Sequence, residues 1–301
     1  MPREVLPGRT YMITRRCTQR QFLMRPDRET NNAFIYCLAE AANRYGIEVI
    51  FTVAMSNHHH TGIYDPEGNY PAFLEHFHKF FAKCQNALRG RWENFWSSEP
   101  TSVVRAVEPD DLLQKMVYAL TNPVKDGLVE KAHHWPGVTS LEAQLQNTTL
   151  SAKRPKHFFR DEGPMPESVE LRLARPRGFE HLSNEELAKS ILERVRDTEE
   201  RTAAERRRAG TRVLGRKGVL AQRWSDRPGN SEPRRALNPR VAARSQWSRL
   251  EALLRNRAFR DAYAAARAAF IAGVTNVLFP AGTYWLHRFV RALREPHPSG
   301  A

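Results

Sequence analysis

Three consecutive histidines, His58, His59 and His60, follow an apolar run at residues 49–56. In an extended strand successive side chains point to opposite faces, so His58 and His60 would share one face and His59 would lie on the other. Two neutral imidazoles with this spacing can bind one divalent ion from one side and leave its other positions for substrate oxygens. A His-x-His pair alone is a weak indication, because histidines near a strand end are more often polar surface groups. The pair predicts a metal site only in combination with further residues.

A tyrosine and an asparagine four residues apart, Tyr118 and Asn122, stand further along the chain. Because Pro123 disfavours the α conformation in the residue before it, a helix that opens at residues 108–111 should end near Asn122 and hold both side chains on one face. A carboxamide oxygen suits a hard ion, Mg²⁺ or Mn²⁺, and a tyrosine can attack phosphorus to form a covalent phosphotyrosine. A tyrosine on an amphipathic helix is more often a core residue. Taken together, the two histidines, Tyr118 and Asn122 predict a metal-assisted, phosphodiester-cleaving site.

The elements that must position these residues can be read from hydrophobic periodicity. Alternating or continuous β-forming runs predict strands, and apolar residues at three- and four-residue intervals predict helices. The expected α+β order is strand 9–17, helix 27–45, strands 47–55 and 58–64, helix 70–89, strand 101–107 and helix 108–121. This order predicts an antiparallel sheet of the ferredoxin or RNA-recognition-motif type with helices on one face.

The two motifs resemble those of a known family. The segments 45–60 and 118–129 resemble the single-tyrosine HUH transposases, in particular the REP-associated tyrosine transposases. In that family a Met-Pro-Asn-His-x-His segment and a Tyr-x-x-x-Asn-Pro-Val-x-x-Gly-Leu-Val segment recur. The resemblance covers about the first 140 residues. This chain departs from the pattern at Ser56, where the family has proline, and at His59, where it has an apolar residue.

Carried over by position, the resemblance implies that His58, His60 and Asn122 hold Mg²⁺ or Mn²⁺ and that Tyr118 is the nucleophile. The family cleaves single-stranded DNA near hairpins, leaves a 5′-phosphotyrosine and a free 3′-hydroxyl, and rejoins strands. A metal-dependent single-strand DNA endonuclease and strand transferase is thus the implied function. A non-catalytic, domesticated hairpin-binding protein is the alternative, and an RNA-binding protein is a third reading. The four intact residues favour the enzyme.

The excess of positive over negative charge is confined to the second half of the chain. Residues 1–150 contain 16 Lys and Arg against 16 Asp and Glu, whereas residues 151–301 contain 31 against 17, so the whole net charge of +14 lies there. A basic domain of this kind indicates a polyanionic partner, most simply DNA. The residues expected to contact DNA are Arg15 and Arg16 at the end of the first strand, and Arg206, Arg207, Arg208, Arg216 and Lys217 in the second half.

The second half is expected to be a separate, mostly helical domain. The division is a catalytic domain at 1–145, a proline-containing linker at 146–180 and a basic domain at 181–301. A capping box at residues 183–186 predicts a helix that ends at Gly210, and a second amphipathic helix should cover 247–271. Its expected buried side is Leu250, Leu253, Leu254, Phe259, Tyr263, Ala266 and Phe270. Four aromatics could stack on bases, but core packing is favoured for the last three: Trp224, Trp247, Tyr284 and Trp285.

Cys17, Cys37 and Cys84 are scattered and lack a CxxC pair, which is typical of reduced thiols in the cytoplasm. The sequence shows no signal-peptide pattern and no apolar stretch of transmembrane length. We therefore expect a cytoplasmic, nucleoid-associated protein with no membrane contact. Whether it acts as a monomer or a homodimer is open.

Overall fold

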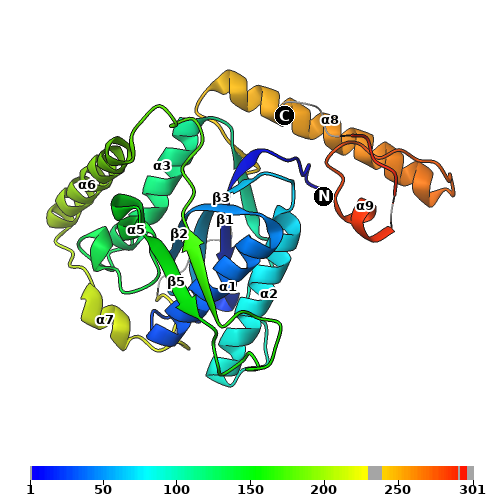
Figure 1. The fold of residues 1–301 in the computed structure, drawn as a ribbon. Coiled ribbons are helices and arrows are strands. Elements are labelled where there is room, and N and C mark those ends of the chain that lie inside the picture. The colour runs from blue at the N-terminus through cyan, green and yellow to red at the C-terminus, as the bar shows by residue number, and fades with distance from the viewer. Residues whose placement is uncertain (1, 230–238, 291, 297–301) are drawn as a thin grey trace.

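A five-stranded sheet forms the centre of the molecule (Figure 1). The computed structural model describes residues 2–229, 239–290 and 292–296. The strand order is β2-β3-β1-β4-β7, antiparallel except for the last pair, which is parallel. The strands are β1 (Arg9–Arg16), β2 (Glu48–Ala54), β3 (His58–Asp65), β4 (Ser102–Ala106) and β7 (Val241–Ala242). The first four agree with the strands expected from the sequence, whereas β7, from the second half, was not foreseen.

Two helices cover one face of the sheet. Helix α1 (Arg28–Tyr45) begins at Asp27, whose carboxylate accepts a hydrogen bond from the Thr30 backbone N–H at 2.8 Å, and ends at Gly46 in the left-handed conformation. Helix α2 (Tyr70–Arg89) packs beside it. Their apolar stripes meet the inward-facing residues of β1, β2 and β3 in one core.

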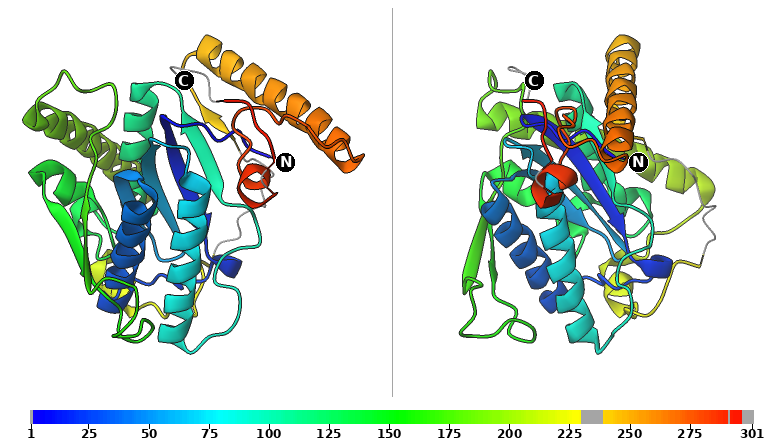
Figure 2. Two further views of the ribbon diagram at one scale, coloured as in Figure 1. Left: turned by 45° about the vertical axis from the view of Figure 1, so that its right-hand side comes forward. Right: turned by 90° about the vertical axis from the view of Figure 1, so that its right-hand side faces the viewer.

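The opposite face is covered as well, so the expectation of helices on one face only is wrong. Helix α3 (Pro109–Leu120) lies across that face, and α6 (Asn184–Ala209) packs beside it. Because α3 buries an apolar stripe that includes Leu112 and Met116, it must have an apolar partner, and the second side of the sheet supplies one. Figure 2 shows these layers from the side. The short α4 (Asn122–Lys125) follows α3 directly.

The segment expected to be an irregular linker is ordered and packed. Helix α5 (Leu141–Gln146) leads into a hairpin of β5 (Thr149–Lys153) and β6 (Ser168–Arg172). The hairpin lies over α1, and its Val169 and Leu171 belong to the same core as α1 and α2. Its strands are only five residues long and are separated by a proline-rich loop, which hides their alternation in the sequence. The domain limits proposed from the sequence stay a prediction.

The remaining elements come from the basic second half, and α8 differs most from expectation. They are α7 (Gly215–Ala221), α8 (Gln246–Ile271) and α9 (Trp285–Val290), with 3₁₀ turns earlier in the chain at Thr18–Arg20 and Ala132–His134. Helix α8 stands out from the body (Figures 1 and 2). Its only residues buried are Ala252 and Phe259, whereas the expected core residues Leu250, Leu253, Leu254 and Phe270 are exposed, as are Trp247 and Trp285. The prediction that these residues are core is therefore wrong, because the body of the protein does not reach the outer side of α8.

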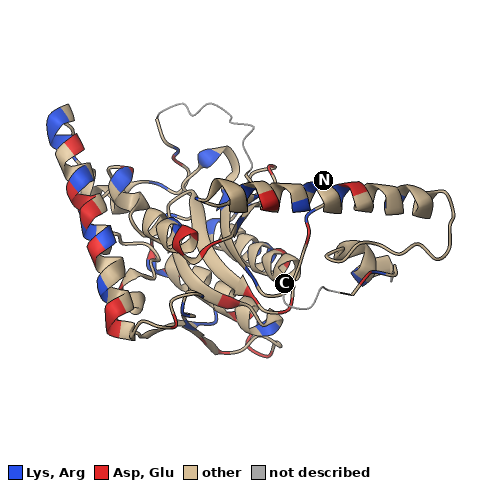
Figure 3. Ribbon diagram, turned by 90° about the horizontal axis from the view of Figure 1, so that it is seen from above, with Lys and Arg blue, Asp and Glu red and all other residues tan. Residues whose placement is uncertain are grey.

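Charges along α6 follow the helix dipole. Glu185 and Glu186 occupy the first turn, and the arginines at 206–208 occupy the last, before Gly210. Ser183 and Glu186 form the expected capping box, each side chain accepting from the other's backbone N–H. Figure 3 shows acidic and basic residues mixed along α6, with basic residues at its far end. Among the described residues no helix combines the length and the apolar character needed to cross a bilayer.

The packing of α6 on the sheet can be tested with two matched leucine substitutions. Leu187 on α6 is 6% exposed, whereas Leu254 on α8 is 56% exposed. Leu187→Ala should lower the free energy of unfolding by about 2–4 kcal/mol because it leaves a cavity. Leu254→Ala should change it by no more than about 0.5 kcal/mol. Urea denaturation measures both, and equal losses would show that α6 does not belong to the core.

Candidate metal and nucleophile site

Two imidazoles and a carboxamide converge on the face of the sheet that α3 covers. Strand β3 places His58 and His60 on this face, and Asn122 reaches them from the start of α4. The Asn122 amide nitrogen lies 3.0 Å from Nε2 of His58 and 3.2 Å from Nε2 of His60. The two imidazole rings are perpendicular, with centroids 4.9 Å apart. The structure therefore brings together the three residues that the sequence predicts as ligands.

The other ring nitrogens are held by neighbours that set the tautomers. The Asn57 amide nitrogen donates to the Arg20 carbonyl at 3.2 Å, which turns its oxygen toward Nδ1 of His58 at 2.7 Å. Nδ1 of His58 must then carry the proton, and Nε2 presents a lone pair. Thr14 Oγ1 lies 2.8 Å from Nδ1 of His60, its partner across β1 and β3. Hydrogen bonds of this kind orient imidazoles that bind metals.

The donor set fits a divalent ion. Burial, and next the charge of His58, hold the pKa of His60 well below its usual value, so the ring stays neutral as a metal ligand must be. A half-turn of the Asn122 amide would present its oxygen to an ion shared with the two Nε2 atoms. Two imidazoles and one amide oxygen leave positions open for substrate oxygens. Among the described residues no group of three His, Cys, Asp or Glu side chains is placed to bind a metal.

His59 lies on the other face, as strand alternation predicts. It is fully buried against Phe34 and Phe77. Nε2 of His59 lies 3.0 Å from Nε2 of His78, and its Nδ1 lies 3.0 Å from Oγ1 of Thr61. Both ring nitrogens are thus engaged on the α2 side of the sheet, and burial lowers the pKa of His59 to about 3. His59 is a core residue in contact with α2.

Tyr118 is half-exposed at the edge of the same site. Its ring centroid is 6.1 Å from that of His60, and 49% of the residue is exposed. It therefore lies beside the candidate ligands and is open to a substrate, unlike an ordinary core tyrosine on an amphipathic helix. The site opens into a pocket of about 840 Å³ that Arg16 and Arg20 also line.

Lys125 is a functional candidate that the sequence did not reveal. Its ammonium lies 3.4 Å from the centroid of the Tyr118 ring and donates a 2.9 Å hydrogen bond to the Tyr118 carbonyl oxygen. Burial lowers the pKa of Lys125 to about 8. It follows Tyr118 by seven residues, two helical turns, but the break at Thr121 between α3 and α4 hides this relation. Lys125 therefore places a positive charge beside the half-exposed Tyr118 ring.

Arg15 and Arg16 lie on opposite faces of the sheet. Arg16 lines the pocket at the histidines. Arg15 donates to Nδ1 of His78 at 3.0 Å, and its guanidinium lies over the Trp96 ring, 5.3 Å from the centroid. Of these two arginines Arg16 alone borders the site, whereas Arg15 contributes to the packing around His59.

The second half of the chain closes one side of this pocket. Leu214 and Gly215 donate backbone hydrogen bonds at 2.9 Å to the carbonyls of Gly127 and Leu128, directly after α4. Arg25 Nε donates to the Gln222 carbonyl at 2.7 Å, and Gln222 lines the pocket. The segment around α7 is therefore a wall of the site, although the sequence division assigned it to a separate domain.

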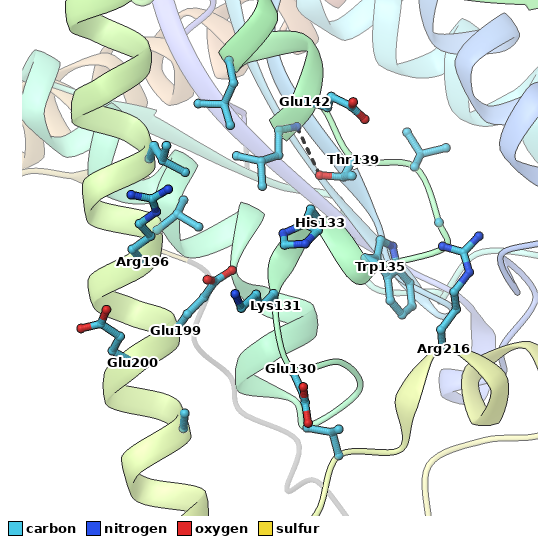
Figure 4. A pocket seen from close by; sticks show the side chains of 18 of the residues that line it. Glu130, Lys131, His133, Trp135, Thr139, Glu142, Arg196, Glu199, Glu200 and Arg216 are labelled. Atoms are coloured by element: carbon cyan, nitrogen blue, oxygen red, sulfur yellow. Dashed lines mark hydrogen bonds between the residues drawn. The ribbon is translucent and has the colours of Figure 1, made fainter.

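The other predicted DNA-binding residues lie at a second, larger groove. Arg206, Arg207 and Arg216 line a groove of about 1610 Å³ between α5, α6 and the turn before α7. Figure 4 shows Arg196 and Arg216 on opposite sides of it, with the carboxylates of Glu130 and Glu199 also in the lining. The two remaining predicted residues, Arg208 and Lys217, are exposed nearby and are not part of the lining.

Comparison with known proteins gives a distant likeness to a solved structure. No family model matches the chain, and no curated protein matches it. A solved structure described as a REP-associated tyrosine transposase bound to a REP hairpin aligns with 58% of this chain and 96% of its own chain. The sequence identity is 16% and the TM-score is 0.42.

The hydrogen bonds that orient the imidazoles can be tested with two threonine substitutions. Thr14→Val removes the partner of His60 Nδ1 and should weaken Mn²⁺ binding about 10- to 100-fold. Thr61→Val is the matched control, because it removes the partner of His59 Nδ1 on the other face and should leave Mn²⁺ affinity unchanged. Isothermal titration calorimetry gives both affinities. The assignment fails if the two variants bind Mn²⁺ equally well.

Proposed function

We propose that this protein is a metal-dependent single-strand DNA endonuclease and strand transferase with Tyr118 as its nucleophile. One observation carries the proposal: Nε2 of His58 and Nε2 of His60 converge on the Asn122 amide beside a half-exposed tyrosine. The two motifs that supply these residues are those in which the sequence resembles the REP-associated tyrosine transposases. That resemblance points to hairpin-forming DNA as the substrate.

The reaction is a transesterification at phosphorus. The Tyr118 phenol oxygen forms a bond to the scissile phosphorus while the bond from phosphorus to the 3′-oxygen breaks. The phenolic proton passes to solvent, and the leaving 3′-oxygen takes up a proton, which gives a 5′-phosphotyrosine and a free 3′-hydroxyl. Attack by a 3′-hydroxyl in the reverse direction joins strands without ATP, because the phosphotyrosine conserves the bond. An ion held by His58, His60 and Asn122 would polarise the phosphate and offset its charge in the transition state.

The cations around the pocket suit a DNA backbone. Arg16 and Arg20 line the pocket at the histidines, and Lys125 lies over the Tyr118 ring. Charged groups of this kind position phosphates without reading sequence. The groove lined by Arg206, Arg207 and Arg216 offers a second basic surface for DNA that flanks the cleaved strand.

The nucleophile is tested by trapping a covalent adduct. End-labelled single-stranded DNA with a hairpin, incubated with the protein and Mn²⁺, should give a labelled band at protein size on a denaturing gel. Tyr118→Phe should abolish the band, because no other group at the site supplies a phenol oxygen. Tyr64→Phe, at the far end of the same face of β3, is the control and should retain it. Tight DNA binding with no adduct from any hairpin would favour a non-catalytic hairpin-binding protein.

Single substitutions test whether His58 and His60 are metal ligands and His59 is not. His58→Ala and His60→Ala should each lower metal-dependent adduct formation at least about 100-fold, since each removes a ligand. His59→Val should lower stability, because it leaves Nε2 of His78 without its partner, but should retain cleavage in the folded protein. Adduct formation is measured at a temperature at which circular dichroism shows every variant folded. Loss of cleavage in folded His59→Val would refute the assignment.

A further inference from the structure

Arginines gather at the opposite end of β1 from the histidines. Arg3 from the N-terminal arm, Arg9 from β1, Arg105 from β4 and Arg240 from the residue before β7 line one small cavity. Tyr11 and Tyr70 complete it, with ring centroids 4.6 Å apart. Four guanidiniums from four separate segments thus meet in one place.

Two carboxylates lie in or near this cavity among the described residues. Glu4 is the carboxylate that lines the cavity, and both of its oxygens lie 3.2 Å from Nε of Arg255 on α8. Asp65 lies near Tyr11, but its carboxylate accepts backbone hydrogen bonds from residues 68–70. These two carboxylates are therefore already engaged elsewhere.

One buried donor of the cavity lacks an acceptor, and two tyrosine hydroxyls beside it are not bonded to the described part of the protein. Nε of Arg9 is buried and has no hydrogen-bond partner among the described residues. Tyr11 and Tyr70 are 5% and 4% exposed, and no hydrogen bond joins either hydroxyl to another residue in the described part of the chain. Burial raises the pKa of Tyr70 to about 12, so its hydroxyl keeps the proton that it can donate. A buried donor without an acceptor, such as Nε of Arg9, is costly, which indicates a missing acceptor.

Electrostatic repulsion among the arginines also indicates that the cavity binds an anion. Burial is the main cause that lowers the pKa values of Arg3, Arg9 and Arg240. The next contributions that lower them come from neighbouring arginines: Arg240 acts on Arg3, and Arg105 acts on Arg9. Like charges brought together in a partly buried cluster destabilise the fold unless an anion offsets them.

We propose that this cavity binds a phosphate group. Guanidiniums and phenol hydroxyls are donors only toward an anion, and guanidiniums match the geometry of phosphate oxygens. The cavity volume of about 30 Å³ exceeds what one water requires and is far below the volume of a small-molecule site. It therefore accepts a single phosphate group, either of a DNA backbone or as a free ion, and excludes a whole nucleotide.

This site is separate from the Tyr118 site. Arg9 and Thr14 lie five residues apart on β1, which corresponds to about 17 Å along an extended strand. Tyr11 shares a core with α1 and α2, whereas the histidine pair lies on the α3 face. Phosphate binding here is therefore independent of whether Tyr118 cleaves DNA.

Thermal unfolding of the full chain in phosphate and in chloride at equal ionic strength tests the site. At phosphate tenfold above its dissociation constant, the midpoint of the wild type should rise by about 2 to 3 °C. Arg105→Gln should lose this rise, and in chloride it should unfold at the same temperature or higher, because repulsion is relieved. Arg257→Gln, at a 75% exposed position on α8, is the matched control and should keep the full rise.

A DNA-binding measurement distinguishes a phosphate of the DNA backbone from a free phosphate ion. Binding of labelled single-stranded DNA is measured in Tyr118→Phe protein with and without Arg105→Gln. If the backbone occupies the cavity, Arg105→Gln weakens binding and reduces the salt dependence by about one phosphate contact. If DNA binding is unchanged while the phosphate-dependent rise is lost, the site holds a free anion.

The proposal is overturned if phosphate stabilises the wild type no more than chloride does. It is also overturned if Arg105→Gln retains the rise. Should Arg105→Gln fail to fold, Tyr70→Phe removes one donor and keeps the ring, and it should reduce the rise. An unchanged rise in folded Tyr70→Phe and Arg9→Gln would likewise refute the site.

Discussion

The antiparallel pairing of β1 with β3 governs what this protein can do. It sets Thr14 opposite His60 and Arg16 opposite His58, so the two imidazoles share one face with a hydroxyl and a guanidinium beside them. A shift of one residue in β3 would turn both imidazoles into the core beneath α1 and α2 and leave His59 alone at the surface. The buried bonds of His59 oppose that shift. The packing of His59 in the core on one face of the sheet thus fixes the position of His58 and His60 on the other face.

Much of the fold around this pairing could be predicted, because it depends on local signals. Period-two and period-3.6 patterns gave the strands and helices of the first 121 residues, and Asp27, Gly46 and Pro123 marked helix ends. The placement of His58 and His60 on one face and His59 on the other followed from the alternation of side chains along a strand alone. The face on which α3 lies could not be predicted in this way. An apolar stripe requires an apolar partner but does not say which side of a sheet provides it.

Contacts between distant segments of the chain could not be predicted from the sequence. Lys125 meets Tyr118 across a break in the helix, β7 joins the sheet from the second half, and the α7 segment walls the pocket. The amphipathic pattern of α8 was equally misleading, because Leu250, Leu253 and Leu254 have no part of the body beside them to pack against, whereas Phe259 does. Positions such as Leu250 look like core in the sequence and are surface in the structure. Tertiary context, which a single sequence does not contain, decides each of these cases.

The contact between the two ends of the chain has a consequence for how the molecule forms. The Val5 backbone N–H donates to the Gly282 carbonyl at 3.0 Å, and Glu4 pairs with Arg255. Gly282 has a positive φ, and a Cβ there would meet Glu4, so the close approach requires glycine. Translation from residue 5 to residue 282 takes on the order of 15 to 55 s at 5–20 residues per second. The arm that leaves the ribosome first can therefore complete its contacts only after residue 282 has been made.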